Sequence, residues 1–269
     1  MLGPLFVREW LTVPRRSRHY VTRFAYLLGL LILGLTAWHA TLGWDREVTL
    51  GDTARFGGLI FRLFAIVQLT LILFFSALAA ASAVSLEKDR RTFILLLITD
   101  LRSYEIVLGK LFGSLLQIGL LLAGVVPVLV LLLLLGGVAF HQVVQVLVIL
   151  TATTLAAGSL GSLVALWRER TFQALALTVL FLVLYLCLVQ GLAYLPPISL
   201  GSAGDLNLAF ARNWLDPFHA TEAALSSHTG VDAAIPSAYI FGGVMVLWAV
   251  LLNAWGIWRL RVWNPSGEP

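Results

Sequence analysis

The chain has 269 residues, of which 59% are hydrophobic and only 12% are charged. Soluble domains carry roughly 25% charged residues, so this composition excludes an ordinary water-soluble enzyme, and the apolar content excludes a disordered or fibrous protein. The formal net charge is +4. In a membrane protein this charge indicates arginine and lysine held on the cytoplasmic side, and we expect no nucleic-acid partner.

The first 23 residues are expected to form an interfacial amphipathic helix and a basic run. The apolar residues near one helical face are Leu2, Leu5, Phe6, Trp10 and Val13, and residues 15–19 are mostly basic. This pattern suits a helix that lies in the cytoplasmic leaflet and contacts membrane lipid. A basic flank without a defined helix is the alternative.

Six apolar segments are long enough to cross a membrane as helices, since a span needs about 20 predominantly apolar residues. They cover residues 24–44, 60–84, 106–135, 143–167, 172–195 and 239–258. An open sheet would leave backbone groups unpaired in lipid. The predicted fold is therefore an all-α membrane protein with a six-helix transmembrane domain over residues 24–258. Pro127 in the third segment predicts a kink or a tilt.

The placement of basic residues predicts the orientation of these helices. Arginine and lysine gather before the first segment, between the second and third, between the fourth and fifth, and after the sixth. Both termini, including a tail over residues 259–269, are then expected in the cytoplasm. We expect a multi-pass protein of the inner or plasma membrane.

The long loop over residues 196–236 is expected on the outer side. Its sequence predicts two short helices, over residues 205–214 and 217–227, which carry several apolar side chains. Two interpretations stay open. The helices close the outer end of the bundle or dip into the outer leaflet, or they form a folded surface loop.

The segment over residues 85–105 carries the most information. A charged cluster over residues 87–91 follows the second span, and the apolar stretch 93–98 is too short to cross a bilayer. Ser103 is expected to cap the next helix, with Glu105 near its positive end. The pattern predicts a short helix across the cytoplasmic mouth of the bundle. An ordinary charged loop with a surface helix is the alternative.

The sequence lacks the residues that several kinds of transport and catalytic chemistry need. The centres of the six segments contain no charged residue, which argues against an ion-coupled transporter or an intramembrane protease. No P-loop is present, because Lys110 is followed by Leu111, and Cys187 gives no metal-ligand pattern. We expect no enzyme activity, cofactor or metal in this chain. The polar residues expected to hydrogen-bond between helices are His39, Gln68, Gln117, Gln145, Gln173, Gln190 and Asn253.

Residues 86–110 resemble the cytoplasmic segment of ABC-2 type transporter permeases. Members commonly read L-E-K-E-R-x-x-G-T-L-E-x-L-L-x-T-P-x-S-x-x-E-I-x-x-G-K. The residues that fit this pattern after small gaps are Leu86, Glu87, Lys88, Arg90, Thr92, Leu95, Leu96, Thr99, Ser103, Glu105, Ile106, Gly109 and Lys110. The chain departs from it at Arg91, Ile94 and Asp100, where glycine, an acid and proline are common. The order of an interfacial helix, six spans and a structured outer loop is also similar to that of the family.

The resemblance implies a permease subunit that moves a substrate across the membrane, mostly outward. Separate ATP-binding-cassette subunits would hydrolyse ATP with Mg, and the permease would form a homodimer or a heterodimer with a similar subunit. Residues 87–99 would act as a coupling helix. Glu87, Lys88, Asp89, Arg90 and Arg91 would contact the ATPase through charge, Phe93, Leu96 and Leu97 would enter its groove, and Thr92 and Thr99 belong to the same segment. The alternative is a membrane anchor or assembly factor that transports nothing and recruits a cytosolic partner.

Overall fold

The computed structural model describes residues 17–41, 49–90, 92–93, 102–194, 198–199, 205–206, 209–226 and 236–263. Its long helices are α2 (Ser17–Thr41), α3 (Leu50–Asp89), α5 (Ser103–Leu135), α6 (Phe140–Trp167), α7 (Thr171–Gly191) and α10 (Ser237–Trp263). The short elements are a 3-10 turn, η2 (Leu192–Tyr194), and the helices α8 (Ala209–Leu215) and α9 (Pro217–Ser226). Two strands of two residues, β1 (Ile198–Ser199) and β2 (Asp205–Leu206), pair antiparallel.

Each of the six long helices is long and apolar enough to cross a membrane, which confirms the predicted number and order of spans and fits an integral multi-pass membrane protein. Helix α3 is longer than the predicted segment 60–84 at both ends. Its first turn is capped, because Asp52 N–H donates to Thr49 Oγ1 at 3.3 Å and Thr49 N–H donates to the Asp52 carboxylate at 3.2 Å. Between Arg62 and Glu87 the helix has no charged residue, and at ~1.5 Å per residue this stretch can cross a hydrocarbon core of ~30 Å.

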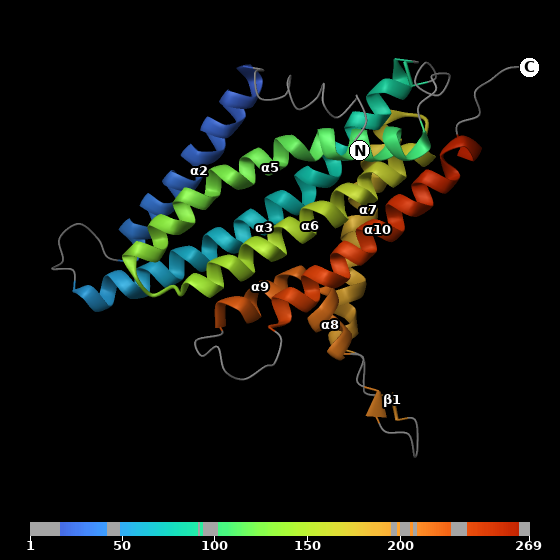
Figure 1. The fold of residues 1–269 in the computed structure, drawn as a ribbon. Coiled ribbons are helices and arrows are strands. Elements are labelled where there is room, and N and C mark those ends of the chain that lie inside the picture. Colours follow the sequence, from blue (N-terminus) through green and yellow to red (C-terminus); the bar gives the residue numbers. More distant parts are fainter. Residues whose placement is uncertain are drawn as a thin grey trace, which may run out of the picture.

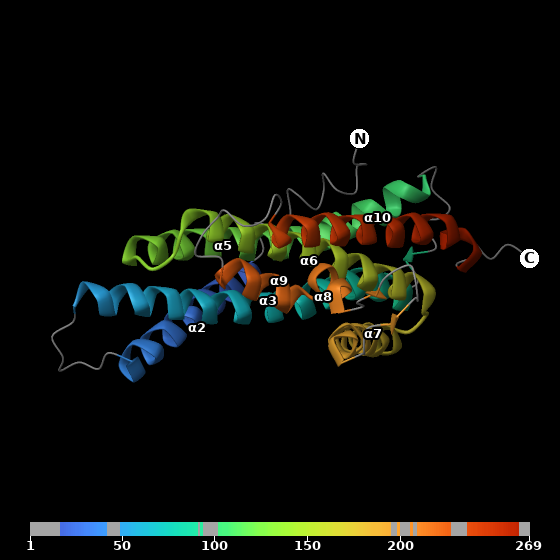
Figure 2. The same ribbon diagram turned by 90° about the horizontal axis from the view of Figure 1, so that it is seen from below.

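Helices α3, α5, α6 and α10 run side by side, and α7 crosses them steeply (Figures 1 and 2). Helix α6 is the centre of the bundle, since it packs against α3, α5, α7 and α10 and 67% of its apolar stretch is buried. Helix α2 lies at the edge, beside α5, and only 6% of its apolar stretch is buried. Most of α2 is therefore available to lipid or to another protein.

Small residues allow α3 and α6 to approach each other closely. A Cβ atom added at Gly161 of α6 would lie 2.1 Å from the carbonyl oxygen of Ala77 in α3. Ala77 and its neighbour in space, Ala157, are both buried. Close backbone contact of this kind is how membrane helices gain packing energy where the surrounding lipid is as apolar as their side chains.

The connection from α5 to α6 is a tight turn that needs glycine. Gly136 and Gly137 have φ values of +89° and +77°, a region that side-chain-bearing residues rarely adopt. A Cβ atom at Gly137 would also lie 2.0 Å from the carbonyl oxygen of Ala54 in α3. Helix α5 itself continues through Pro127.

Several predicted boundaries need correction. Arg102, not Ser103, is the N-cap residue of α5, and the Glu105 carboxylate accepts a hydrogen bond from Arg102 N–H at 3.0 Å. Helix α2 already begins at Ser17, so part of the predicted basic run is helical. Helix α10 continues to Trp263, which lies inside the predicted tail over residues 259–269. The predicted interfacial helix lies outside the described residues.

The loop over residues 196–236 does carry two helices, but the first is shorter than predicted. Asp205 and Leu206 form β2, and α8 begins only at Ala209. Helix α9 packs against α3, α6 and α10, with Ala220 and Ala224 fully buried. This packing favours the interpretation in which these helices close one end of the bundle.

Candidate functional site

Six of the residues predicted to contact an ATPase lie where α3 ends, and the other four, Arg91, Leu96, Leu97 and Thr99, lie outside the described residues. We call this region the charged end. It comprises residues 87–90, 92 and 93, the start of α5 from Arg102 to Lys110, and the α6–α7 connection from Leu166 to Thr171, at the upper right of Figure 1. Glu87, Lys88 and Asp89 form the last turn of α3, where a separate coupling helix had been predicted to begin.

Glu87 connects α3 to α5. Its carboxylate forms an ion pair with the Lys110 ammonium, and the two side chains are only 25% and 9% exposed. The carboxylate supplies the counter-charge that a lysine at this depth needs, since an unpaired buried charge is strongly disfavoured. The second carboxylate oxygen of Glu87 is buried and has no hydrogen-bond partner in the described residues.

Lys88 connects α3 to the end of α6. Its ammonium donates to the carbonyl oxygen of Leu166 at 2.6 Å and to that of Arg168 at 3.1 Å. These carbonyls belong to the last turn of α6 and the residue after it, where the regular hydrogen-bond pattern of the helix ends. A cation at this position also complements the negative end of the helix dipole.

Asp89 connects α3 to α7. Its carboxylate accepts a hydrogen bond from the hydroxyl of Thr171, the first residue of α7. An anion near a helix N-terminus is favourable, because the first N–H groups of the helix carry partial positive charge. Asp89 and Lys88 thus meet helix ends of opposite polarity.

The three side chains reach three helices because they are consecutive. Successive residues of an α-helix point about 100° apart, so Glu87, Lys88 and Asp89 leave α3 in different directions. One turn of α3 is thereby joined to α5, α6 and α7. A displacement of this turn would be transmitted to all three helices.

Phe93 lies in the core of this chain. It is 3% exposed and packs in an apolar cluster with Val84 of α3, Ile106 of α5 and Leu166 of α6. The chain folds back after α3 because Thr92 N–H donates to the carbonyl oxygen of Glu87 at 3.0 Å. Phe93 is covered by its own chain, so the predicted insertion of this ring into an ATPase groove does not agree with its position.

Three of the predicted site residues are exposed. Arg90 and Thr92 are exposed, and Asp89 is exposed although Thr171 bonds it. The partners of Glu87, Lys88 and Asp89 were not identified from the sequence; they are Lys110, Leu166, Arg168 and Thr171. For Lys110 a signal was present, since a lysine followed by an apolar helix needs an acidic partner and Glu87 lies in the same motif.

At the opposite end, Asp216 connects α8 and α9 to α7. It is 1% exposed and accepts hydrogen bonds from Gln190 Nε2 at 2.8 Å, Arg212 Nε at 3.2 Å and Phe218 N–H at 2.9 Å. Tyr185 Oη of α7 donates to Leu215 O at 2.5 Å. These contacts hold the loop helices against the bundle.

Arg62 and Glu222 add a second link at this end. Their side chains form an ion pair between α3 and α9, and both are more than half exposed.

Two of the polar span residues bond across helices as predicted. Asn253 of α10 donates to Ser159 Oγ of α6 at 2.7 Å, and Gln190 bonds Asp216. Gln68 differs, because it is 2% exposed and its Oε1 atom has no partner among the described residues. It lines a cavity, described next.

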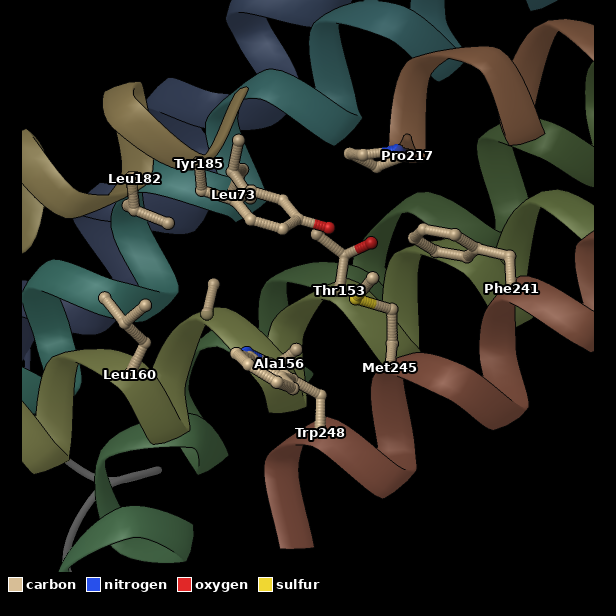
Figure 3. A pocket seen from close by; sticks show the side chains of 11 residues that line it. Leu73, Thr153, Ala156, Leu160, Leu182, Tyr185, Pro217, Phe241, Met245 and Trp248 are labelled. Carbon is tan, nitrogen blue, oxygen red and sulfur yellow. The ribbon is translucent and has the colours of Figure 1, made fainter. Parts of the chain in front are cut away.

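Two cavities lie inside the bundle. The smaller measures about 30 Å³ and lies between α3, α6, α7 and α10, where Thr153 Oγ1 is buried without a described partner (Figure 3). Its size and largely apolar lining suit at most about one water molecule. The larger measures about 530 Å³ and lies between α2, α3, α5 and the start of α7. The larger one has the volume of a ligand pocket, roughly 300–1,000 Å³, as does a third and more open one of about 370 Å³ between α6 and α10.

Within the described residues, no group of three or more His, Cys, Asp or Glu side chains could hold a metal ion. No protein-family model matches the chain, and no curated protein matches it.

Proposed function

We propose that this chain is the permease subunit of an ABC-type transporter, which moves a substrate across the membrane while a separate ATPase subunit hydrolyses ATP. The observation that carries the proposal is the junction at the end of α3. The segment that resembles ABC-2 permeases begins at this junction, where Glu87, Lys88 and Asp89 join α3 to three other spans. If a membrane bundle without charged residues at its span centres moves its substrate against a gradient, the energy must come from a partner outside the spans.

In this proposal the charged end faces the cytoplasm and receives force from the ATPase. Arg90 and Thr92, together with the predicted contact residues Arg91, Leu96, Leu97 and Thr99, form the docking surface. Glu87, Lys88 and Asp89 transmit the displacement to α5, α6 and α7. Phe93 anchors the docking segment in the apolar cluster beneath it.

The same proposal assigns ATP and Mg to the partner and gives this chain no catalytic role. The permease pairs with a second copy or a similar subunit. Export is the expected direction from the family resemblance. Helix α2, of which little is buried in one chain, is a surface through which subunits could pair.

An affinity purification from the native membrane tests the proposal. We expect a P-loop ATPase to co-purify with the tagged chain. Reversing the charge of an exposed contact, Arg90→Glu, should release this ATPase and abolish ATP hydrolysis that depends on the permease. Arg55→Glu is the matched control, because Arg55 is an exposed arginine near the opposite end of the same helix.

Both variants should insert and fold alike, since neither arginine has a buried side chain. If both retain the ATPase equally, the docking surface is wrong. If a cytosolic partner without a nucleotide site co-purifies instead, the chain is an anchor or assembly factor.

A further inference from the structure

The 530 Å³ cavity follows one stripe of α3. The residues of α3 that line it include Gln68, Ile72, Phe75, Ala79 and Ser82, spaced three or four apart along one helical face. Gln68 and Ser82 are separated by about 21 Å along the helix, since each residue rises ~1.5 Å. The stripe lies inside the uncharged stretch between Arg62 and Glu87, so the cavity is at the depth of the hydrocarbon core.

Two residues that line this cavity carry a polar side-chain atom without a hydrogen-bond partner among the described residues. The hydroxyl of Tyr26 on α2 and the Oε1 atom of Gln68 are both buried without a hydrogen-bond partner among the described residues. Gln68 itself is 2% exposed. A buried polar group without a partner is destabilised by roughly 1–3 kcal/mol, so a ligand that reached either atom from the cavity would supply a missing hydrogen bond.

The lining decides the chemistry of that ligand. Of the residues that the structure places around the cavity, none is charged, and most of the surface is apolar. A carboxylate or ammonium would be buried there without a counter-charge, which is strongly unfavourable. A tyrosine hydroxyl can donate or accept and a glutamine amide can do both, so hydroxyl, ester or amide groups would satisfy them.

The wall formed by α2 gives a route from the membrane. Leu30 is the only buried residue among the described α2 side chains, and Phe75, on the opposite wall, is 51% exposed. The cavity is thus continuous with the lipid-facing surface beside α2. A molecule dissolved in the bilayer can reach it without crossing water.

The geometry points to a binding site, between α2, α3 and α5, for a neutral amphiphile that has an apolar body and hydroxyl or ester groups. As a substrate site it rests on the proposed transport function. As a binding site it does not, because binding is measured without ATP or an ATPase.

The test uses the full chain in phosphatidylcholine nanodiscs and tritiated monoolein, a neutral monoacylglycerol. We expect saturable binding above that of empty discs, displaced by unlabelled monoolein. Tyr26→Phe and Gln68→Leu should each weaken binding by about five-fold, the net value of one hydrogen bond. Ala79→Phe, which fills the cavity, should abolish saturable binding. Tyr239→Phe, at an exposed tyrosine of α10, is the matched control and should bind as the wild type does.

Two competitors test the chemical class. Oleate carries the same chain with a charge, and 1-octadecene is a hydrocarbon of matching chain length without a polar group, so both should displace the label poorly. Equal displacement by 1-octadecene, absence of saturable binding, or unchanged affinity in both Tyr26→Phe and Gln68→Leu would overturn the site. Those results leave the co-purified ATPase unaffected, so the two proposals fail separately.

Discussion

The carboxylate of Glu87 and the ammonium of Lys110 form an ion pair between the last turn of α3 and the second turn of α5. The two residues lie on either side of the predicted docking segment in the sequence, so the ion pair joins the helices that flank that segment. Lys110 is 9% exposed, so its charge has little access to solvent. The pair therefore matters for the position of both helix ends, and its contribution can be measured.

The first prediction concerns this pair. Glu87→Gln should lower the free energy of unfolding by about 3 kcal/mol, because removing one partner of a buried pair leaves the other charge uncompensated. The double variant Glu87→Gln/Lys110→Met should be less destabilised than the sum of the single variants. Unfolding in mixed detergent–SDS micelles gives the three values.

The control for this prediction is the pair of Arg62 with Glu222, whose side chains are 57% and 61% exposed. The same double-mutant cycle there should give a coupling of at most about 1 kcal/mol. Equal coupling for the two pairs would show that burial does not determine the strength of the Glu87–Lys110 link.

The second prediction concerns the contact of α3 with α6. Gly161→Ala should destabilise the bundle by about 1–3 kcal/mol, since the added Cβ would lie 2.1 Å from a backbone oxygen that only a shift of the helices can relieve. Gly119→Ala in α5 is the control, because no atom lies within 4 Å of its added Cβ. That variant should be unchanged or slightly more stable. Equal stability of the two variants would contradict the close approach at Ala77.

The third prediction concerns the loop helices. Asp216→Ala should release α8 and α9, because Arg212, Gln190 and the Phe218 N–H of α9 lose their acceptor. We expect a loss of about 2–4 kcal/mol and faster amide exchange in α9, with α6 unaffected. Asp216→Asn keeps a capping oxygen and should lose less. If α9 exchanges no faster in Asp216→Ala, the carboxylate does not hold the loop helices.

The spans were predictable because hydropathy over 20 residues is a local property, and the six segments were found in the right order. The junction was not, because Thr171 and the carbonyl of Leu166 lie about 80 residues from their partners in α3. Phe93 shows the same limit. An apolar residue after a charged cluster suits a docking surface and a core equally well, and only the packing against Ile106 and Leu166 distinguishes them.

The last prediction separates Lys88 from its exposed neighbour. Lys88→Met keeps most of the apolar stem but leaves the carbonyls of Leu166 and Arg168 without their donor, so the last turn of α6 should fray. We expect a loss of about 1–3 kcal/mol and faster amide exchange at Arg168, whose N–H bonds Val164 O at 3.0 Å. Arg90→Met is the control, since Arg90 is exposed, and its unfolding free energy should stay within about 0.5 kcal/mol of the wild type. Slow exchange at Arg168 in Lys88→Met would mean that α6 holds its own end, and the Lys88 bonds would then not link α3 to the end of α6.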